Sequence, residues 1–148
     1  MLSEEVVQSI SSKYLEARNT VNLDLLDDIY AEGVVVHDCS APEDIQGLAS
    51  LKAFYKTSHA GFPDLQVSFD DVLPSKNHLV FRGRIEGTNT GTLRGMPPTG
   101  RHVSFSCAAI DRIEGGMIVE EWVYFNVLDL LSQLGAMPAP TAPTKSGT

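Results

Sequence analysis

The 148-residue sequence has few of the features that mark a disulfide scaffold, a membrane span or a nucleic-acid-binding surface. Its two cysteines, Cys39 and Cys107, have no CxxC spacing and do not suggest a disulfide framework. No run approaches the roughly 18 consecutive apolar residues of a spanning helix. With 11 Lys and Arg against 19 Asp and Glu, the net charge is −8. Without a basic cluster, nucleic acid and anionic membranes are poor partners.

The N-terminus has neither the basic nor the apolar segment of a signal peptide. Together with the cysteine pattern, this predicts a reduced, cytoplasmic protein. The apolar fraction of 43% and the charged fraction of 20% are ordinary for a soluble globular chain. We therefore expect one domain over residues 1–136. Residues 137–148, mostly Pro, Ala, Thr and Gly, predict a disordered tail.

The first half of the sequence predicts three helices and one strand. Apolar residues recur at helical spacing from Glu4 to Arg18, and Ser3 is a suitable N-cap. A shorter helix is expected from Asn22 to Ile29, and a third spans roughly Leu48 to His59. Between them, the β-branched run Val34–Val36 predicts a strand, followed by a loop through residue 46.

Beyond Pro63 the apolar residues alternate with period two, which predicts antiparallel strands. The expected strands are 65–72, 79–85, 103–113 and 117–125. A long loop over 87–100 and a short closing helix over 128–134 complete the pattern. Helices that precede antiparallel strands indicate an α+β fold.

The last two strands predict a hairpin with two acidic residues on its apolar face. A three-residue turn, 114–116, pairs Ile113 with Met117 and so places Ala109 opposite Glu121. The expected concave face carries Val103, Phe105, Cys107, Ala109, Asp111, Val119, Glu121, Val123 and Phe125. The outer face carries Ser104, Ser106, Trp122 and Tyr124. Carboxylates on an apolar face are informative because buried charge is costly unless it is paired or used.

Several segments occur in the order known from one family. They are GFPDL at 61–65, GTNTG at 87–91, GMPPTGR at 95–101, IVEEW at 118–122 and LLSQLG at 130–135. Over residues 4 to about 136 the sequence resembles the SnoaL-like polyketide cyclases, of the nuclear-transport-factor-two-like superfamily. The resemblance implies a cone-shaped curved antiparallel sheet closed by N-terminal helices. It also implies an apolar pocket for a hydrophobic small molecule, no cofactor, and a homodimer formed through the outer face of the sheet.

The resemblance also bears on catalytic residues. The aldol cyclases of this group use a His on the penultimate strand and an Asp just after the EEW-type segment; those positions are Ala109 and Val123 here. A second resemblance links residues 14–38 to bacterial ketosteroid isomerases, which share the fold. It implies that Tyr14 donates a hydrogen bond to the substrate oxygen and that Asp38 shuttles the proton. The isomerases' second donor again falls on Ala109.

The predicted catalytic residues are therefore Asp38 and Tyr14, with Glu121 in reserve. Each has a structural alternative: Asp38 as a loop cap, Tyr14 as a packing residue, and Glu121 as the partner of Arg82 or Arg84. Residues expected to contact substrate are His37, Tyr55, Phe105, Cys107, Asp111 and Phe125. Asp111 lies near the turn, where solvated carboxylates are common, and His37 lies on the opposite side of an ideal strand from Asp38.

These observations predict a cofactor-independent cyclase or isomerase. It would act by acid/base proton transfer on a hydrophobic, carbonyl-bearing molecule such as a polyketide- or terpenoid-type intermediate. The alternative is a non-catalytic ligand-binding or accessory domain, which the residues Ala109 and Val123 favour. The four histidines have no HxH or HExxH spacing and predict no metal site.

Overall fold

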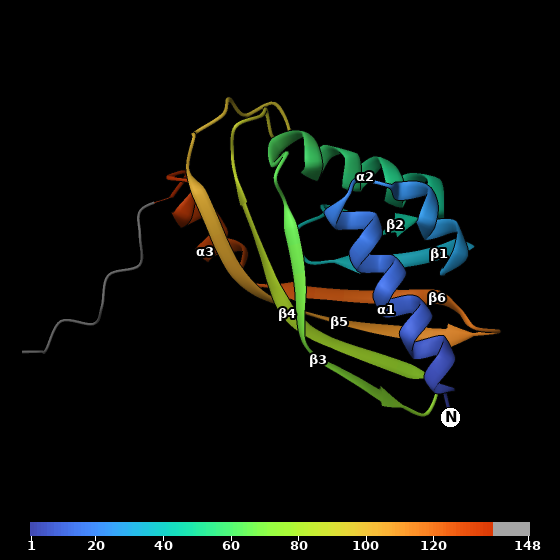
Figure 1. The fold of residues 1–148 in the computed structure, drawn as a ribbon. Coiled ribbons are helices and arrows are strands. Elements are labelled where there is room, and N and C mark those ends of the chain that lie inside the picture. Colours follow the sequence, from blue (N-terminus) through green and yellow to red (C-terminus); the bar gives the residue numbers. More distant parts are fainter. Residues whose placement is uncertain (138–148) are drawn as a thin grey trace, which may run out of the picture.

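The computed structural model describes residues 1–137 (Figure 1). The helices are α1 (Glu4–Asn19), the 3₁₀ helix η1 (Leu23–Asp28), α2 (Leu48–Gly61) and α3 (Val127–Gln133). The strands are β1 (Tyr30–Asp38), β2 (Ile45–Gln46), β3 (Gln66–Ser75), β4 (His78–Thr88), β5 (His102–Glu114) and β6 (Met117–Phe125). The predicted tail, apart from Met137, lies outside the described residues. None of the described helices has the length and apolar character needed to cross a membrane.

The strands form one sheet in the order β2-β1-β6-β5-β4-β3. The pairing of β1 with β6 is parallel, and each of the other pairings is antiparallel. The sheet curves around α1, and α2 lies across its open side (Figure 1). This arrangement confirms the predicted α+β fold with a curved sheet closed by N-terminal helices.

Three predicted elements differ from those observed. The second helix is the 3₁₀ helix η1 rather than an α-helix. Strand β1 begins at Tyr30, four residues earlier than expected, because Tyr30 is buried and pairs with Ile118. The expected loop after β1 contains the short edge strand β2.

The apolar stripe of α1 packs into the hollow of the sheet. The Ser3 side chain accepts a hydrogen bond from the Val6 N–H and so caps the helix, as predicted. Val6, Ile10 and Tyr14 follow at intervals of four residues, so they lie on one face of the helix. All three belong to the main apolar core or pack against it.

The turn between β5 and β6 is tighter than predicted. Gly115 and Gly116 both have positive φ, 58° and 78°, so Glu114 pairs directly with Met117. Two glycines in the left-handed region suit a two-residue hairpin turn, whereas the prediction assumed three turn residues. A bulge next to this turn leaves Val119 as the extra residue of β6. Ile118 therefore takes the fully buried position expected for Val119.

As a result, the predicted register of the hairpin is wrong by two positions. Asp111 lies opposite Glu121, and Ala109 lies opposite Val123. Because side chains alternate along a strand, a two-residue displacement leaves the same side chains on the concave face, except at the bulge, where Ile118 replaces Val119. What changes is which of them meet: the two acids now face each other.

Asn89 fixes the long loop between β4 and β5 against the end of α2. Its side-chain N–H groups donate to the carbonyl oxygens of Gly61 and Gly91, each at 3.0 Å. Its side-chain oxygen accepts from the backbone N–H and the hydroxyl of Thr99, each at 2.9 Å. Asn89 is 2% exposed, so this buried amide has its partners within the protein.

The close approach of β3 to β4 gives a test of the sheet. A Cβ at Gly83 would overlap the carbonyl oxygen of Ser68, whereas a Cβ at Gly33 would meet nothing within 4 Å. We expect Gly83→Ala to lower the free energy of unfolding by about 1–3 kcal/mol, as other overpacked sites do. Gly33→Ala, the matched control, should change it little. Equal effects in urea denaturation would contradict the observed β3–β4 packing.

Candidate active site

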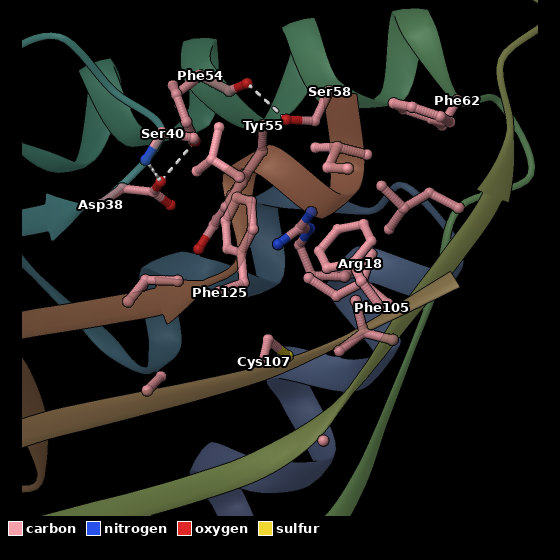
Figure 2. A pocket seen from close by; sticks show the side chains of 18 of the residues that line it. Arg18, Asp38, Ser40, Phe54, Tyr55, Ser58, Phe62, Phe105, Cys107 and Phe125 are labelled. Atoms are coloured by element: carbon pink, nitrogen blue, oxygen red, sulfur yellow. Dashed lines mark hydrogen bonds between the residues drawn. The ribbon is translucent and has the colours of Figure 1, made fainter. Parts of the chain in front are cut away.

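A cavity of about 340 Å³ lies between the concave face of the sheet and the three α-helices. Most of its wall is apolar, including side chains from α2, α3 and the loop between β4 and β5. The polar and ionisable lining residues are Tyr14, Arg18, Asp38, Ser40, Tyr55, Ser58, Arg94, Cys107, Asp111 and Glu121. Figure 2 shows several of these around the Arg18 guanidinium, with Asp38 and Ser40 at another side of the space. An apolar cavity with a few polar groups is typical of a small-molecule site.

Every predicted site residue except His37 lines this cavity. His37 lies on the outer face of the sheet, where its ring stacks on Trp122 with the ring centroids 5.4 Å apart. Its two ring nitrogens lie 2.9 Å from Asp44 and 2.7 Å from Glu120. Hydrogen bonds to these two carboxylates raise the pKa of His37. The structure therefore separates His37 from the candidate site.

Asp38 lines the cavity and also caps the loop that follows β1. Its Oδ1 accepts hydrogen bonds from the backbone N–H of Ser40 at 2.8 Å and from the Ser40 hydroxyl at 2.6 Å (Figure 2). The charge of Asp38 contributes to the raised pKa of Glu121, so the two carboxylates act on the same cavity. Asp38 therefore has the expected loop-capping role, and its carboxylate also borders the cavity.

Asp111 and Glu121 form a buried carboxyl pair in the cavity wall. They are 1% and 3% exposed and lie opposite each other on β5 and β6. Burial and then the charge of Glu121 raise the pKa of Asp111 well above its ordinary value. Burial also raises the pKa of Glu121, while hydrogen bonds from Asp111 and Tyr30 oppose that rise. Of the two, Asp111 therefore holds its proton more strongly, and Glu121 is the readier to ionise.

The surroundings of Glu121 differ from the predicted alternative. The Tyr30 hydroxyl lies 3.0 Å from both of its carboxylate oxygens. Arg82 instead pairs with Asp71 at 2.6 Å, and Arg84 donates to the Ser104 hydroxyl. Glu121 is thus held by a neutral phenol rather than by a cation.

The carboxyl pair lies one step along the hairpin from the positions that the family resemblance implied. Ala109 and Val123 face each other, and the next pair on the same face of the sheet is Asp111 with Glu121. Two residues along a strand correspond to roughly 7 Å. Carboxyl groups are therefore present on the concave face, displaced toward the turn.

Arg18 is a cavity residue that the sequence analysis missed. It is 5% exposed and continues the α1 stripe of Ile10 and Tyr14 at the same four-residue interval. Its Nη1 donates to the Tyr14 hydroxyl at 2.9 Å, and its guanidinium carbon lies 3.9 Å from the centroid of the Tyr55 ring. Such a desolvated cation–π contact stabilises by roughly 2 kcal/mol. The signal in the sequence was an arginine at a position where the helical pattern requires an apolar residue.

His59 supports Arg18 from the neighbouring helix. It lies four residues after Tyr55 on the buried side of α2, and its Nε2 lies 3.3 Å from the Arg18 Nε–H. Burial and the charge of Arg18 lower the pKa of His59 to about 4. The imidazole is therefore neutral near pH 7 and accepts the hydrogen bond. Its Nδ1 is buried without a partner among the described residues.

The two phenols and the thiol of the cavity are neutral. Burial raises the pKa of Tyr14 and, more strongly, that of Tyr55, so both phenols keep their protons. Burial also raises the pKa of the Cys107 thiol, which disfavours the nucleophilic thiolate. Among residues 1–137, no group of three or more His, Cys, Asp or Glu side chains is arranged to hold a metal ion.

Comparisons with known proteins agree with this architecture. The family described as SnoaL-like polyketide cyclase matches residues 8–134. TsrD from Streptomyces laurentii superposes with a TM-score of 0.83 at 26% identity, over 93% of this chain and 100% of TsrD. IdmH from Streptomyces antibioticus, named as a candidate polyketide cyclase, gives 0.76 at 24% identity, over 87% of this chain and 98% of IdmH.

A more distant structure extends the likeness to the second predicted group. A Catenulispora acidiphila protein with a ketosteroid isomerase-like fold superposes with a TM-score of 0.73 at 17% identity. The match covers 90% of this chain and 97% of that protein. No curated protein sequence matches the chain significantly. This likeness shows a shared fold, whereas the chemistry of the chain depends on the residues of its site.

The carboxyl pair predicts a specific pH dependence of stability. Because the folded-state pKa of Asp111 is raised, the folded chain binds more protons than the unfolded chain between the two pKa values. The free energy of unfolding therefore falls as the pH rises through that window. Asp111→Asn removes this titration and keeps the side-chain shape. Its stability relative to wild type should increase as the pH is raised from about 4 to neutral, measured by urea denaturation.

Glu120→Gln is the matched control, one residue from Glu121 but on the outer face. The hydrogen bond from His37 lowers the pKa of Glu120, so its contribution is present above the ordinary value of 4.5 and is lost on acidification. Its stability deficit should therefore shrink as the pH falls. A pH-independent difference between Asp111→Asn and wild type would show that Asp111 does not titrate as a buried acid.

Proposed function

The chain belongs to the SnoaL-like polyketide cyclase family, and from this premise we propose that it is a cofactor-independent cyclase or isomerase. Its substrate is a hydrophobic, carbonyl-bearing small molecule of the polyketide or terpenoid type, on which it moves a proton by acid/base catalysis. The observation that carries this proposal is the Asp111–Glu121 carboxyl pair in the wall of an apolar cavity. A carboxyl group with a raised pKa in a desolvated site is suited to proton transfer near neutral pH.

In this proposal Glu121 is the base. It removes a proton from the carbon next to the substrate carbonyl, and the electron pair of the broken C–H bond passes to the carbonyl oxygen. Asp111 and the Tyr30 hydroxyl donate hydrogen bonds to the Glu121 carboxylate and fix its position. Glu121 then returns the proton, either to another carbon in an isomerisation or to the new alkoxide after ring closure.

Tyr14 is the proposed donor to the substrate oxygen. Its hydroxyl accepts a hydrogen bond from Arg18, so its own proton is free to be donated into the cavity. The adjacent guanidinium polarises the phenol and makes it a stronger donor toward a developing enolate. A preorganised donor in a dry site stabilises such charge without reorganising solvent.

Asp38 is the alternative base, as the isomerase resemblance implies. Its Oδ1 is occupied by the two hydrogen bonds from Ser40, which fix the carboxylate but compete with a role as acceptor. Glu121 is deeper and its pKa is raised, so the geometry favours it. The non-catalytic ligand-binding function remains the second candidate, because Ala109 and Val123 occupy the family's usual catalytic positions.

A model ketone tests the proposal without knowledge of the natural substrate. 2-Tetralone is hydrophobic and exchanges the protons next to its carbonyl, so NMR in D₂O can follow deuterium uptake above the buffer rate. Glu121→Gln should lower the enzymic rate by roughly a hundredfold or more. Tyr14→Phe should lower it less and act mainly on kcat. The outer-face control Glu120→Gln should leave it unchanged.

The outcomes separate the candidates. Loss in Asp38→Asn with full activity in Glu121→Gln would transfer the role of base to Asp38. If wild type binds 2-tetralone without accelerating exchange, and neither change alters any reaction found for the protein, the acid/base proposal fails. The ligand-binding function would then take its place.

A homodimer formed through the outer face of the sheet is also proposed. That face carries Trp122 and Tyr124, and Tyr124 is 52% exposed. Large aromatic side chains on one sheet face are poorly placed in water and suit a protein contact. We expect sedimentation at micromolar protein to report a dimer and Tyr124→Lys to shift it toward monomer. A monomer in the wild-type protein at that concentration would exclude this interface.

A further inference from the structure

Arg18 is a buried cation without a neutralising anion in the described structure. Within residues 1–137, no Asp or Glu forms an ion pair with it; its polar partners are Tyr14 and His59. Both are neutral near pH 7, because burial raises the pKa of Tyr14 and lowers that of His59. Removing a charge from water without supplying a counter-charge is costly. A protein that keeps such a residue in a cavity wall has a use for the charge.

The neighbours of Arg18 fix its side chain but leave some of its N–H groups available to a ligand. The hydrogen bonds to Tyr14 and His59 occupy two of the five N–H groups of a guanidinium. The Tyr55 ring packs against one of its faces at 3.9 Å, and the head group lines the cavity (Figure 2). These contacts come from two helices and preorganise the guanidinium. Preorganisation reduces the entropy lost when a ligand binds.

Glu121 does not serve as the counter-ion. Arg18 lowers the pKa of Glu121, but less than the hydrogen bonds from Asp111 and Tyr30 do. The strongest partners of Glu121 are Asp111 and Tyr30. Arg18 and the carboxyl pair thus line the same cavity from different elements: Arg18 belongs to α1, and Asp111 and Glu121 belong to the β5–β6 hairpin.

We propose that Arg18 binds a carboxylate of the substrate, which is therefore a hydrophobic carboxylic acid that also carries the reacting carbonyl. A planar guanidinium matches the two oxygens of a carboxylate, and a charge-assisted pair of hydrogen bonds fixes orientation as well as position. The apolar part of the substrate would fill the rest of the cavity, whose volume of about 340 Å³ admits a small ligand. This inference rests on the proposed function only in assigning both groups to one ligand.

The test uses two probes of nearly equal shape and different charge. 2-Naphthoate carries an ionised carboxylate at neutral pH, and 2-naphthamide is its neutral counterpart. We expect wild-type protein to bind 2-naphthoate more tightly than 2-naphthamide by at least roughly tenfold, measured by isothermal titration calorimetry. This comparison needs no substituted protein. Equal affinity, or a preference for the amide, would overturn the proposal.

Variants then assign the preference to a residue. Arg18→Met keeps an unbranched stem and removes the charge, so the preference for 2-naphthoate should disappear while the amide affinity changes little. Arg18→Lys keeps the charge without the planar fork and should retain part of the preference. 2-Naphthoate should also raise the Tm of wild type but not of Arg18→Met, which checks binding in each folded variant.

Arg94 provides the matched control. It also lines the cavity, but its Nη1 donates to the Ser40 carbonyl oxygen at 3.0 Å and it lies on the loop between β4 and β5. Arg94→Met should preserve the charge preference. If Arg94→Met abolishes the preference and Arg18→Met does not, the assignment to Arg18 is wrong.

Binding and turnover can fail independently. A clear preference for 2-naphthoate would support the Arg18 site even if 2-tetralone exchange is not catalysed and neither Glu121→Gln nor Asp38→Asn alters any reaction found, which would reject the acid/base function. Catalysed exchange that depends on Glu121, without any charge preference, would do the reverse.

Discussion

The pairing of β5 with β6 is the constraint on which the candidate site depends. The two-residue glycine turn and the adjacent bulge set the register, and the register places Asp111 opposite Glu121. A turn of three residues would have placed Glu121 opposite Ala109, so that Asp111 and Glu121 would not face each other. Two carboxyl groups that face each other in a dry wall cannot both ionise without a large electrostatic cost. Burial and this repulsion raise the pKa of Asp111, and the proposed acid/base function rests on that property of the pair.

The same register divides the chemistry of neighbouring residues between two environments. Glu120 and Glu121 are adjacent, yet they point to opposite faces of β6. Glu120 joins a partly solvated network with His37 and Arg112, where its negative charge is stabilised. Glu121 lies in the wall of the apolar cavity, where burial raises its pKa against the opposing effect of the hydrogen bonds from Asp111 and Tyr30. The ion pairs of Glu120 thus lie on the outer face of the sheet, and Glu121 on the cavity side has none with a described cation.

The fold could be predicted from the sequence because its signals are local and repeated. Helical spacing after a Ser cap and period-two alternation beyond Pro63 depend on neighbours in the chain, and the structure confirms both. The register could not be predicted, because Glu114-Gly115-Gly116 is compatible with turns of two or three residues. A bulge has no signal of its own, so the meeting of Asp111 with Glu121 was missed and Asp111 was expected near solvent.

Arg18 illustrates a different limit. Its position on the α1 stripe was visible in the sequence, but a terminal arginine on an amphipathic helix is usually a residue whose stem packs and whose head reaches water. Only the approach of α2 shows that the head is covered, since Tyr55 and His59 close over it from the other helix. The role of His59 could not be predicted for the same reason, since in the sequence it is one of four scattered histidines. The contact between Arg18 and His59, which are 41 residues apart in the sequence, determines both roles.

The charges that remain define a direction within the cavity. Arg18 on α1 and Arg94 on the loop between β4 and β5 are the cations among the lining residues, and the acids are the Asp111–Glu121 pair on the β5–β6 hairpin and Asp38 beside Ser40. Opposite charges around a largely apolar cavity create a field that is screened less than it would be in water. A ligand with a charged end and a polarisable carbonyl has one favourable orientation in such a field. In the proposed complex its charged end meets Arg18, and its acidic C–H bonds face Glu121. The apolar wall, which supplies most of the contact area, cannot by itself distinguish the two ends of a hydrophobic molecule. Orientation therefore depends on the two helices keeping an uncompensated guanidinium in place, and burying that charge is a cost that apolar packing of the rest of the domain has to offset.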